Sequence, residues 1–240
     1  LNNKYMVATR YYYKDTISDF IAKDDMEIVG KLTIAYVHDI NEETKKSWVS
    51  EIDTMKTILR PYAERGSVYF EYNIPRIGRR ADVIVLIDGI VFVLEFKTAN
   101  QEFSREAMVQ VWDYALDLKN FQEGSLDRVL LPIQVVPNEK DRNCTIESKH
   151  FEDNVYEPIQ VNTQKLGEAI KHFLANVTHV PCSREDDDLW AKSGYEPTPT
   201  IIEAAVALFE ENTVEDITKH DGDIDLTAKC LERIICECRE

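Results

Sequence analysis

The feature that most constrains this fold is a pair of apolar runs, residues 81–87 and 90–96, separated only by Asp88 and Gly89. Asp-Gly is a preferred central pair of a two-residue hairpin turn, because both positions must adopt positive φ. The rest of each run is dominated by valine, isoleucine, leucine and phenylalanine, which favour buried strands. The pattern therefore predicts a tight antiparallel hairpin.

The same turn fixes which residues face each other at the open end of the hairpin. Counted outward from the turn, Asp82 falls opposite Glu95, and opposed residues have Cβ atoms about 4.5–5.5 Å apart. Lys97 shares the face of Glu95, whereas Phe96 points to the other face. Such acids repel each other, but Mg²⁺ binds one or two carboxylates together with water and phosphate oxygens. A lysine beside the ion can orient or deprotonate a water for hydrolysis.

A plainer interpretation of the hairpin stays open, in which Asp82 and Glu95 are solvated surface acids and Lys97 neutralises them as an exposed ion pair. Glu51 bears on this choice. It lies within the apolar stripe of a helix expected from Asn41 to Leu59, where a buried carboxylate is unfavourable unless it meets a metal or a donor. The alternative is that Glu51 lies at the edge of this apolar stripe, from where its carboxylate reaches water.

A second helix, expected from Ser104 to about Asn120, carries Gln110 and Tyr114 four residues apart. The two side chains therefore share a helix face, where they can hold a phosphate or orient the lysine. The alternative is that Tyr114 simply packs beside Val111.

Charge gives opposing indications. The net charge of −16 argues against non-specific nucleic-acid binding by the whole chain. Basic residues nevertheless gather at Arg76, Arg79 and Arg80, directly before the hairpin. We expect these three arginines to contact a phosphate backbone.

The order of elements predicts an α/β fold with a mixed central sheet flanked by helices, its core spanning roughly residues 41–137. Residues 12–40 read as short helical segments with a break at Gly30, and 67–74 as a strand with Val68, Phe70 and Tyr72 on one face. The domain is expected to cover residues 1–180, with helical extensions at both ends. The other predicted segments are a strand at 129–136, a helix at 166–177, an acidic, proline-containing linker at 181–199 and a C-terminal helical extension at 200–240.

Cellular context follows from what the sequence lacks. No apolar run approaches the roughly 18–20 residues that span a bilayer, and the first residues lack the features of a secretory signal. The five cysteines are poorly spaced for disulfides or zinc, which favours reduced thiols. We expect a cytoplasmic protein with no membrane partner.

Three segments together resemble the PD-(D/E)XK nuclease superfamily: Arg80-Ala81-Asp82, Glu95-Phe96-Lys97, and the stretch from Gln110 to Tyr114. The last is similar to the QxxxY signature of the RecB-like branch, in which Gln110 and Tyr114 occupy the two named positions. The chain departs from the pattern at Ala81, where the family usually has proline. The resemblance implies a restriction-endonuclease-like core.

The resemblance also implies roles for individual residues. Asp82 and Glu95 would bind Mg²⁺ or Mn²⁺ with the main-chain carbonyl of Phe96, and Lys97 would assist the attacking water. An acid on the first core helix often joins such sites, and Glu51 is the best-placed candidate.

A closer likeness extends over most of the chain. The segments 30–33, 70–97, 110–121 and 198–204 are similar to the N-terminal nuclease-like region of bacterial Schlafen-type P-loop helicases. In those helicases a P-loop ATPase follows this region, whereas this sequence contains no Walker A motif. The resemblance therefore implies either a part of such a helicase or a stand-alone version without the motor.

The leading hypothesis is thus a metal-dependent nuclease acting on DNA. In it Glu51, Asp82 and Glu95 hold the metal ion, and Gln110, Tyr114 and the three arginines bind substrate. The alternative is a catalytically inactive nuclease-fold module that binds nucleic acid or docks a helicase partner.

Overall fold

The computed structural model describes residues 10–36, 40–98, 101–178, 187 and 189–196. By internal contacts the chain divides into two units, Leu1–Glu196 and Pro197–Glu240, and every described residue belongs to the first. The helical extension expected at 200–240 lies outside the described residues, as do all the cysteines except Cys144, which is a free thiol.

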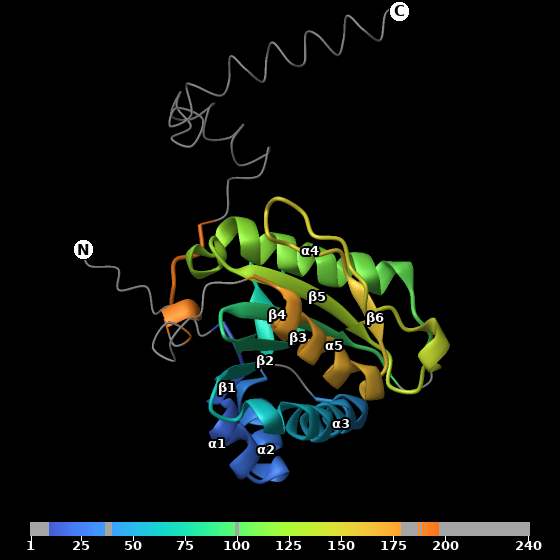
Figure 1. Cartoon of the computed structure of the whole chain (residues 1–240). Coiled ribbons are helices and arrows are strands. Elements are labelled where there is room, and N and C mark those ends of the chain that lie inside the picture. The colour runs from blue at the N-terminus through green and yellow to red at the C-terminus, as the bar shows by residue number, and fades with distance from the viewer. Residues whose placement is uncertain (1–9, 37–39, 99–100, 179–186, 188, 197–240) are drawn as a thin grey trace, which may run out of the picture. The chain divides into compact units, whose positions relative to one another are not determined.

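One six-stranded mixed sheet runs through the described unit, with strand order β1-β2-β3-β4-β5-β6 (Figure 1). The first four strands pair antiparallel, whereas β4–β5 and β5–β6 pair parallel. The α/β class with a mixed sheet is therefore confirmed. The bounds are β1 Tyr13–Thr16, β2 Gly66–Ile74, β3 Arg79–Ile87, β4 Ile90–Phe96, β5 Val129–Val135 and β6 Ile159–Val161.

Helices cover both faces of the sheet, with α4 on one side and α3 and α5 on the other (Figure 1). The helices are α1 Ile17–Ala22, α2 Asp25–Ala35, α3 Glu42–Leu59, α4 Arg105–Phe121 and α5 Thr163–Asn176, with short 3-10 turns η1 Arg60–Tyr62, η2 Glu123–Ser125 and η3 Asp141–Asn143. The predicted caps are confirmed, because the side chains of Asn41 and Ser104 accept hydrogen bonds from first-turn N–H groups. None of the described helices has the length and apolarity needed to cross a bilayer.

A hydrophobic cluster lies on each face of the sheet. One packs the sheet against α1, α2, α3 and α5, and includes Ile52, Phe92 and Ile170. The other packs it against α4, and includes Val93 and Val111. Because the strands are buried on both faces, β3 and β4 read as nearly continuous apolar runs.

The predicted hairpin and its register are confirmed. Asp88 and Gly89 have φ values of 51° and 90°, as the two-residue turn requires. The ladder runs from Ile87 opposite Ile90 to Val83 opposite Leu94.

Several boundaries differ from the sequence expectations. Gly30 lies inside α2 rather than at a break, because its neighbours Ile28 and Leu32 are buried and outweigh the helix penalty of about 1 kcal/mol for one glycine. The core is wider than residues 41–137, since β1 and β6 add a strand at each edge. Both strands are short and carry too few alternating residues to be read from sequence.

Strand β2 is distorted at Glu71, which has a φ of 52°. Val68 and Phe70 join the cluster on the α3 face, whereas Tyr72 joins the one on the α4 face. The prediction that these three share a face is therefore wrong. A residue with positive φ rotates the chain, and a simple alternation pattern does not anticipate this.

Residues 187 and 189–196, here called the closing segment, fall within the stretch predicted to be a linker. Trp190 is buried, and its ring centroid lies 5.4 Å from that of Tyr69 and 5.1 Å from that of Tyr72. Asp187 forms a buried ion pair with Arg128 at 3.0 Å. The linker prediction is therefore wrong for these residues, because one aromatic and one acid find buried partners despite the polar composition around them.

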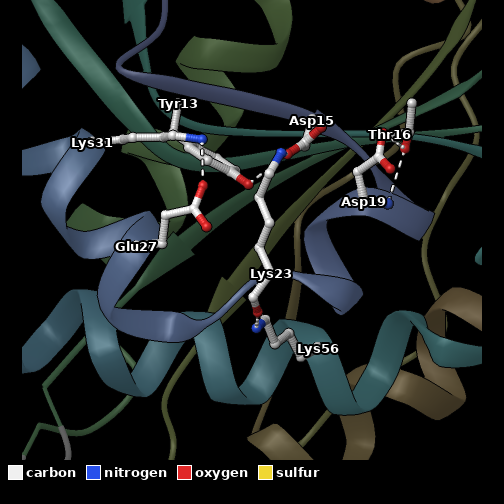
Figure 2. A network of polar contacts seen from close by, with 8 residues as sticks. All are labelled: Tyr13, Asp15, Thr16, Asp19, Lys23, Glu27, Lys31 and Lys56. Atoms are coloured by element: carbon white, nitrogen blue, oxygen red, sulfur yellow. Dashed lines mark hydrogen bonds and ion pairs between the residues drawn. The ribbon is translucent and has the colours of Figure 1, made fainter.

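Polar contacts tie α1 and α2 to β1 and α3 (Figure 2). Lys23, between the two short helices, forms an ion pair with Asp15 of β1. Lys56 of α3 donates to the main-chain carbonyl of Lys23 and pairs with Asp25 at 2.6 Å. These contacts hold the N-terminal helices against α3, the helix that carries Glu51.

Candidate functional site

The hairpin brings Asp82 of β3 beside the end of β4. The regular ladder stops at Val83 and Leu94, one pair before the predicted pairing of Asp82 with Glu95. The carboxylate of Asp82 instead accepts a hydrogen bond from the main-chain N–H of Phe96, with 2.7 Å between Oδ2 and N. Asp82 is thus held next to the residue that follows Glu95.

Glu95 is the centre of a chain of polar contacts between β4 and α4. Its Oε1 accepts hydrogen bonds from Nζ of Lys97 at 2.8 Å and from Nε2 of Gln110 at 2.9 Å. The same amide nitrogen of Gln110 lies 2.6 Å from the hydroxyl of Tyr114. Four residues singled out from the sequence therefore form one hydrogen-bonded chain: Glu95 is bonded to Lys97, directly after β4, and to Gln110, which in turn contacts Tyr114 on α4.

The other carboxylate oxygen of Glu95, Oε2, is buried and has no hydrogen-bond partner among the described residues. The whole residue is only 5% exposed. An unsatisfied buried carboxylate oxygen is strongly unfavourable. It therefore offers a ligand position to a cation.

Glu51 faces inward from α3, as the apolar stripe predicts, and is only 5% exposed. The alternative of a solvated flank position is wrong. Its Oε1 accepts a hydrogen bond from Ser47 at 2.7 Å. Burial, together with repulsion from Glu71 and Glu95 and opposed by the Ser47 hydroxyl, raises the pKa of Glu51 to about 7.

The two hairpin acids are also destabilised as anions. Burial raises the pKa of Asp82 well above its usual range, and repulsion from Glu95 and Glu51 adds to it, against the Phe96 N–H. Burial likewise raises the pKa of Glu95, although the Lys97 ammonium works against this. The interpretation of these residues as solvated surface acids is therefore wrong, and the site favours the uptake of protons or a cation.

Glu71 is a fourth acid of the site that the sequence reasoning missed. Its carboxylate accepts hydrogen bonds from Nε1 of Trp48 at 2.9 Å and Nε of Arg80 at 2.7 Å. Its charge also raises the pKa of the three acids described above. The signal available in the sequence was a charged residue inside an otherwise mostly apolar strand.

The three arginines expected to contact phosphate do not act together. Arg80 is paired with Glu71 and packs on the rings of Tyr12 and Tyr36, at 4.9 and 5.3 Å. The guanidinium of Arg76 lies 4.6 Å from the ring centroid of Phe121. Arg79 alone of the three lines a pocket that also contains a predicted site residue, Gln110.

An open pocket of about 430 Å³ lies on the α3 side of the site, and Glu51, Phe96 and Lys97 are among the residues that line it. In the described part of the chain, no three His, Cys, Asp or Glu side chains are arranged to hold a metal ion together. Mg²⁺ needs only one or two carboxylates when water and phosphate complete its shell. Asp82, the partnerless oxygen of Glu95 and the carbonyl of Phe96 are donors of that kind.

Comparisons with protein-family models, with curated proteins and with solved structures gave no match to this chain. The PD-(D/E)XK resemblance accordingly rests on the motif residues of this sequence, and a functional assignment rests on the geometry of the site.

Proposed function

We propose that this chain is a metal-dependent nuclease that hydrolyses phosphodiester bonds of DNA. The observation that carries the proposal is the state of the buried Glu95 carboxylate. One of its oxygens is held by Lys97 and Gln110, while the other is buried without a partner. Asp82 lies alongside, and burial together with repulsion from neighbouring acids makes both anions unfavourable until a cation joins them.

In this proposal Asp82, Glu95 and the carbonyl of Phe96 hold Mg²⁺ or Mn²⁺. The bound ion would polarise a phosphoryl oxygen and lower the pKa of a water molecule. Lys97 positions that water from its place beside Glu95, and Gln110 orients the Glu95 carboxylate. Glu51, with a pKa of about 7, is able to accept a proton near neutral pH.

The experiment is a cleavage assay with the full chain, plasmid and single-stranded DNA, with Mn²⁺ or Mg²⁺ and with EDTA. We expect Asp82→Asn, Glu95→Gln and Lys97→Ala each to lower activity by about 100-fold or more. The matched control is Asp53→Asn, an exposed acid on α3, which should cleave like the wild type. Equal activity in all variants, or activity that persists in EDTA, would refute the proposal.

A second candidate is an inactive nuclease-fold module that binds nucleic acid or docks a helicase. The ion pair of Lys97 with Glu95 favours it, because an ammonium group already balances one acid. So does the lack of a three-residue metal group in the described residues. Calorimetric titration with Mn²⁺ separates the two: binding that is lost in Glu95→Gln supports the nuclease, and no binding by the wild type supports the inactive module.

The likeness to Schlafen-type helicases supports two further parts of the proposal. DNA is the expected substrate, and a P-loop motor is the expected partner in the full-length protein. Co-purification of this chain with a separately expressed motor domain would test the second part.

A further inference from the structure

A second pocket, of about 400 Å³, lies on the α4 side of the site. Gln110 lines it, and the amide of Gln110 contacts Glu95. The pocket therefore opens directly beside the candidate metal ligands. Its lining residues are Arg79, Arg105, Glu106, Val109, Gln110 and Asp113.

The two arginines of this pocket come from different elements, Arg79 from the start of β3 and Arg105 from the first turn of α4. Both are exposed, and neither guanidinium forms a hydrogen bond or an ion pair with another described residue. This contrasts with Arg80, which is held by Glu71. Arg79 and Arg105 are therefore available to an external anion.

The charge of Arg79 reaches the site, because it lowers the pKa of both Glu95 and Tyr114 against the larger effect of burial. An anion bound by Arg79 would consequently lie close to Glu95. Glu106 and Asp113 also line the pocket, so it is not a broad basic surface. Two guanidinium groups framed by two acids fit one compact anion, such as a single phosphate.

The pocket on the α3 side has its own polar lining, including Lys46, Ser47 and Lys97. The hydrogen-bonded group of Lys97, Glu95 and Gln110 lies between the two pockets, since Lys97 lines one and Gln110 lines the other. A strand that places one phosphate at Glu95 thus has a polar pocket on each side for its neighbours.

We propose that Arg79 and Arg105 form a subsite for the backbone phosphate next to the one that is cleaved. This inference rests on the proposed nuclease function and deepens it. The substrate is then a strand with at least two consecutive phosphates, and a mononucleotide ester lacks the group that this subsite binds.

The first experiment measures binding without catalysis, using a fluorescent single-stranded oligonucleotide in EDTA over a series of salt concentrations. Each phosphate contact contributes about 0.7 to the slope of log K against log salt for single strands. Because the two arginines bind one phosphate, Arg79→Ala/Arg105→Ala should lower the slope by about 0.7. Arg60→Ala/Lys171→Ala removes the same charge from exposed positions outside both pockets and should leave the slope nearly unchanged.

The second experiment locates the contact along the strand. Oligonucleotides with one neutral methylphosphonate at successive positions are cleaved by the wild type and by the arginine double variant. In the wild type, neutralising the phosphate adjacent to the cleaved bond should slow cleavage about 10-fold or more, because a charge-assisted contact is lost. The double variant should be insensitive at that position.

The outcomes separate this inference from the proposed function. The subsite alone would be overturned if metal-dependent cleavage occurs but the two double variants have equal salt slopes. It would also be overturned if the wild type and the arginine double variant are slowed by methylphosphonates at the same positions. Salt-dependent binding that needs the two arginines, with no cleavage under any metal, would support a phosphate site at Arg79 and Arg105. It would reject the nuclease and, with it, the place of that site next to a cleaved bond. Absence of strand binding by the wild type would overturn the subsite.

Discussion

The carboxylate of Asp82 is bound to the main-chain N–H of Phe96, with 2.7 Å between Oδ2 and N. An acid of β3 is thereby fixed against β4 by the backbone itself. The contact holds Asp82 beside Glu95 although the two repel each other. Under the proposed function, this unfavourable arrangement of charges is the consequence of placing two acids where they can bind a metal ion.

Replacing Asp82 should therefore separate function from stability. Asp82→Asn retains an acceptor for the Phe96 N–H but removes a buried charge, so we expect the metal-free protein at pH 8 to gain about 1 kcal/mol or more in free energy of unfolding. Mn²⁺ binding should be lost. Urea unfolding and calorimetry measure the two effects, and a clear loss of stability would show that the buried anion is well paired.

The raised pKa of Glu51 predicts how stability depends on pH. The folded state binds this proton more tightly than the unfolded chain does. The contribution of Glu51 to the free energy of unfolding is therefore fully present below the ordinary glutamate pKa of about 4.3. That contribution is lost as pH rises through the folded-state pKa of about 7. Glu51→Gln should remove this loss and stabilise the metal-free protein at pH 8 by up to about 3 kcal/mol. Thermal unfolding between pH 5 and 8 is the measurement, with exposed Asp53→Asn as the control that should follow the wild type.

Glu71 should set the pH range of the site rather than bind the ion. Its charge raises the pKa of Glu51, Asp82 and Glu95, so Glu71→Gln lowers all three. The pH at which Mn²⁺ binding is half-maximal should fall by about half a unit to one unit, the scale of one nearby like charge. An unchanged midpoint would limit Glu71 to holding Trp48 and Arg80.

The closing segment should contribute strongly to stability through Trp190. This side chain is buried against Tyr69 and Tyr72, and its Nε1 donates to Oγ of Ser125 at 2.8 Å. Trp190→Ala should lower the free energy of unfolding by about 3–5 kcal/mol. The neighbouring Leu189 is 62% exposed, so Leu189→Ala should change it by less than about 0.5 kcal/mol. Similar effects in the two variants would argue against the packing of the closing segment.

Two glycines should respond in opposite directions to alanine. A Cβ on Gly66 would lie 1.8 Å from the carbonyl oxygen of Leu86, whereas one on Gly30 would meet nothing within 4 Å. Gly66→Ala should therefore destabilise the sheet by about 2 kcal/mol or more. Gly30→Ala should stabilise α2 by about 0.5–1 kcal/mol. Chemical denaturation of both proteins checks the β2–β3 register and the continuity of α2 together.

The sequence was most informative where a local rule acts alone. Asp88-Gly89 determines the hairpin and its register without reference to the rest of the molecule. Helical spacing placed Glu51 on the buried face of α3 and Gln110 next to Tyr114 on α4. These predictions need only the periodicity of the chain itself.

The features that escaped prediction depend on partners far away in the chain. Glu71 is recognisable as a site acid only once Trp48 and Arg80 are seen to bind it. Arg105 acquires a role only because its helix starts near Arg79. Trp190 looked like part of a linker because nothing near it in sequence shows that Tyr69 and Tyr72 enclose it.

The closing segment has a consequence for how this protein folds as it is made. Its contacts span most of the chain, since Arg10 donates to the carbonyl of Ser193 across 183 positions, and Tyr69 donates to that of Asp187 across 118. A ribosome adds only about 5–20 residues each second. The sheet, α4 and their buried aromatic rings therefore emerge seconds before the tryptophan that covers them, and the nascent domain passes through a stage with an open apolar face that a chaperone can bind.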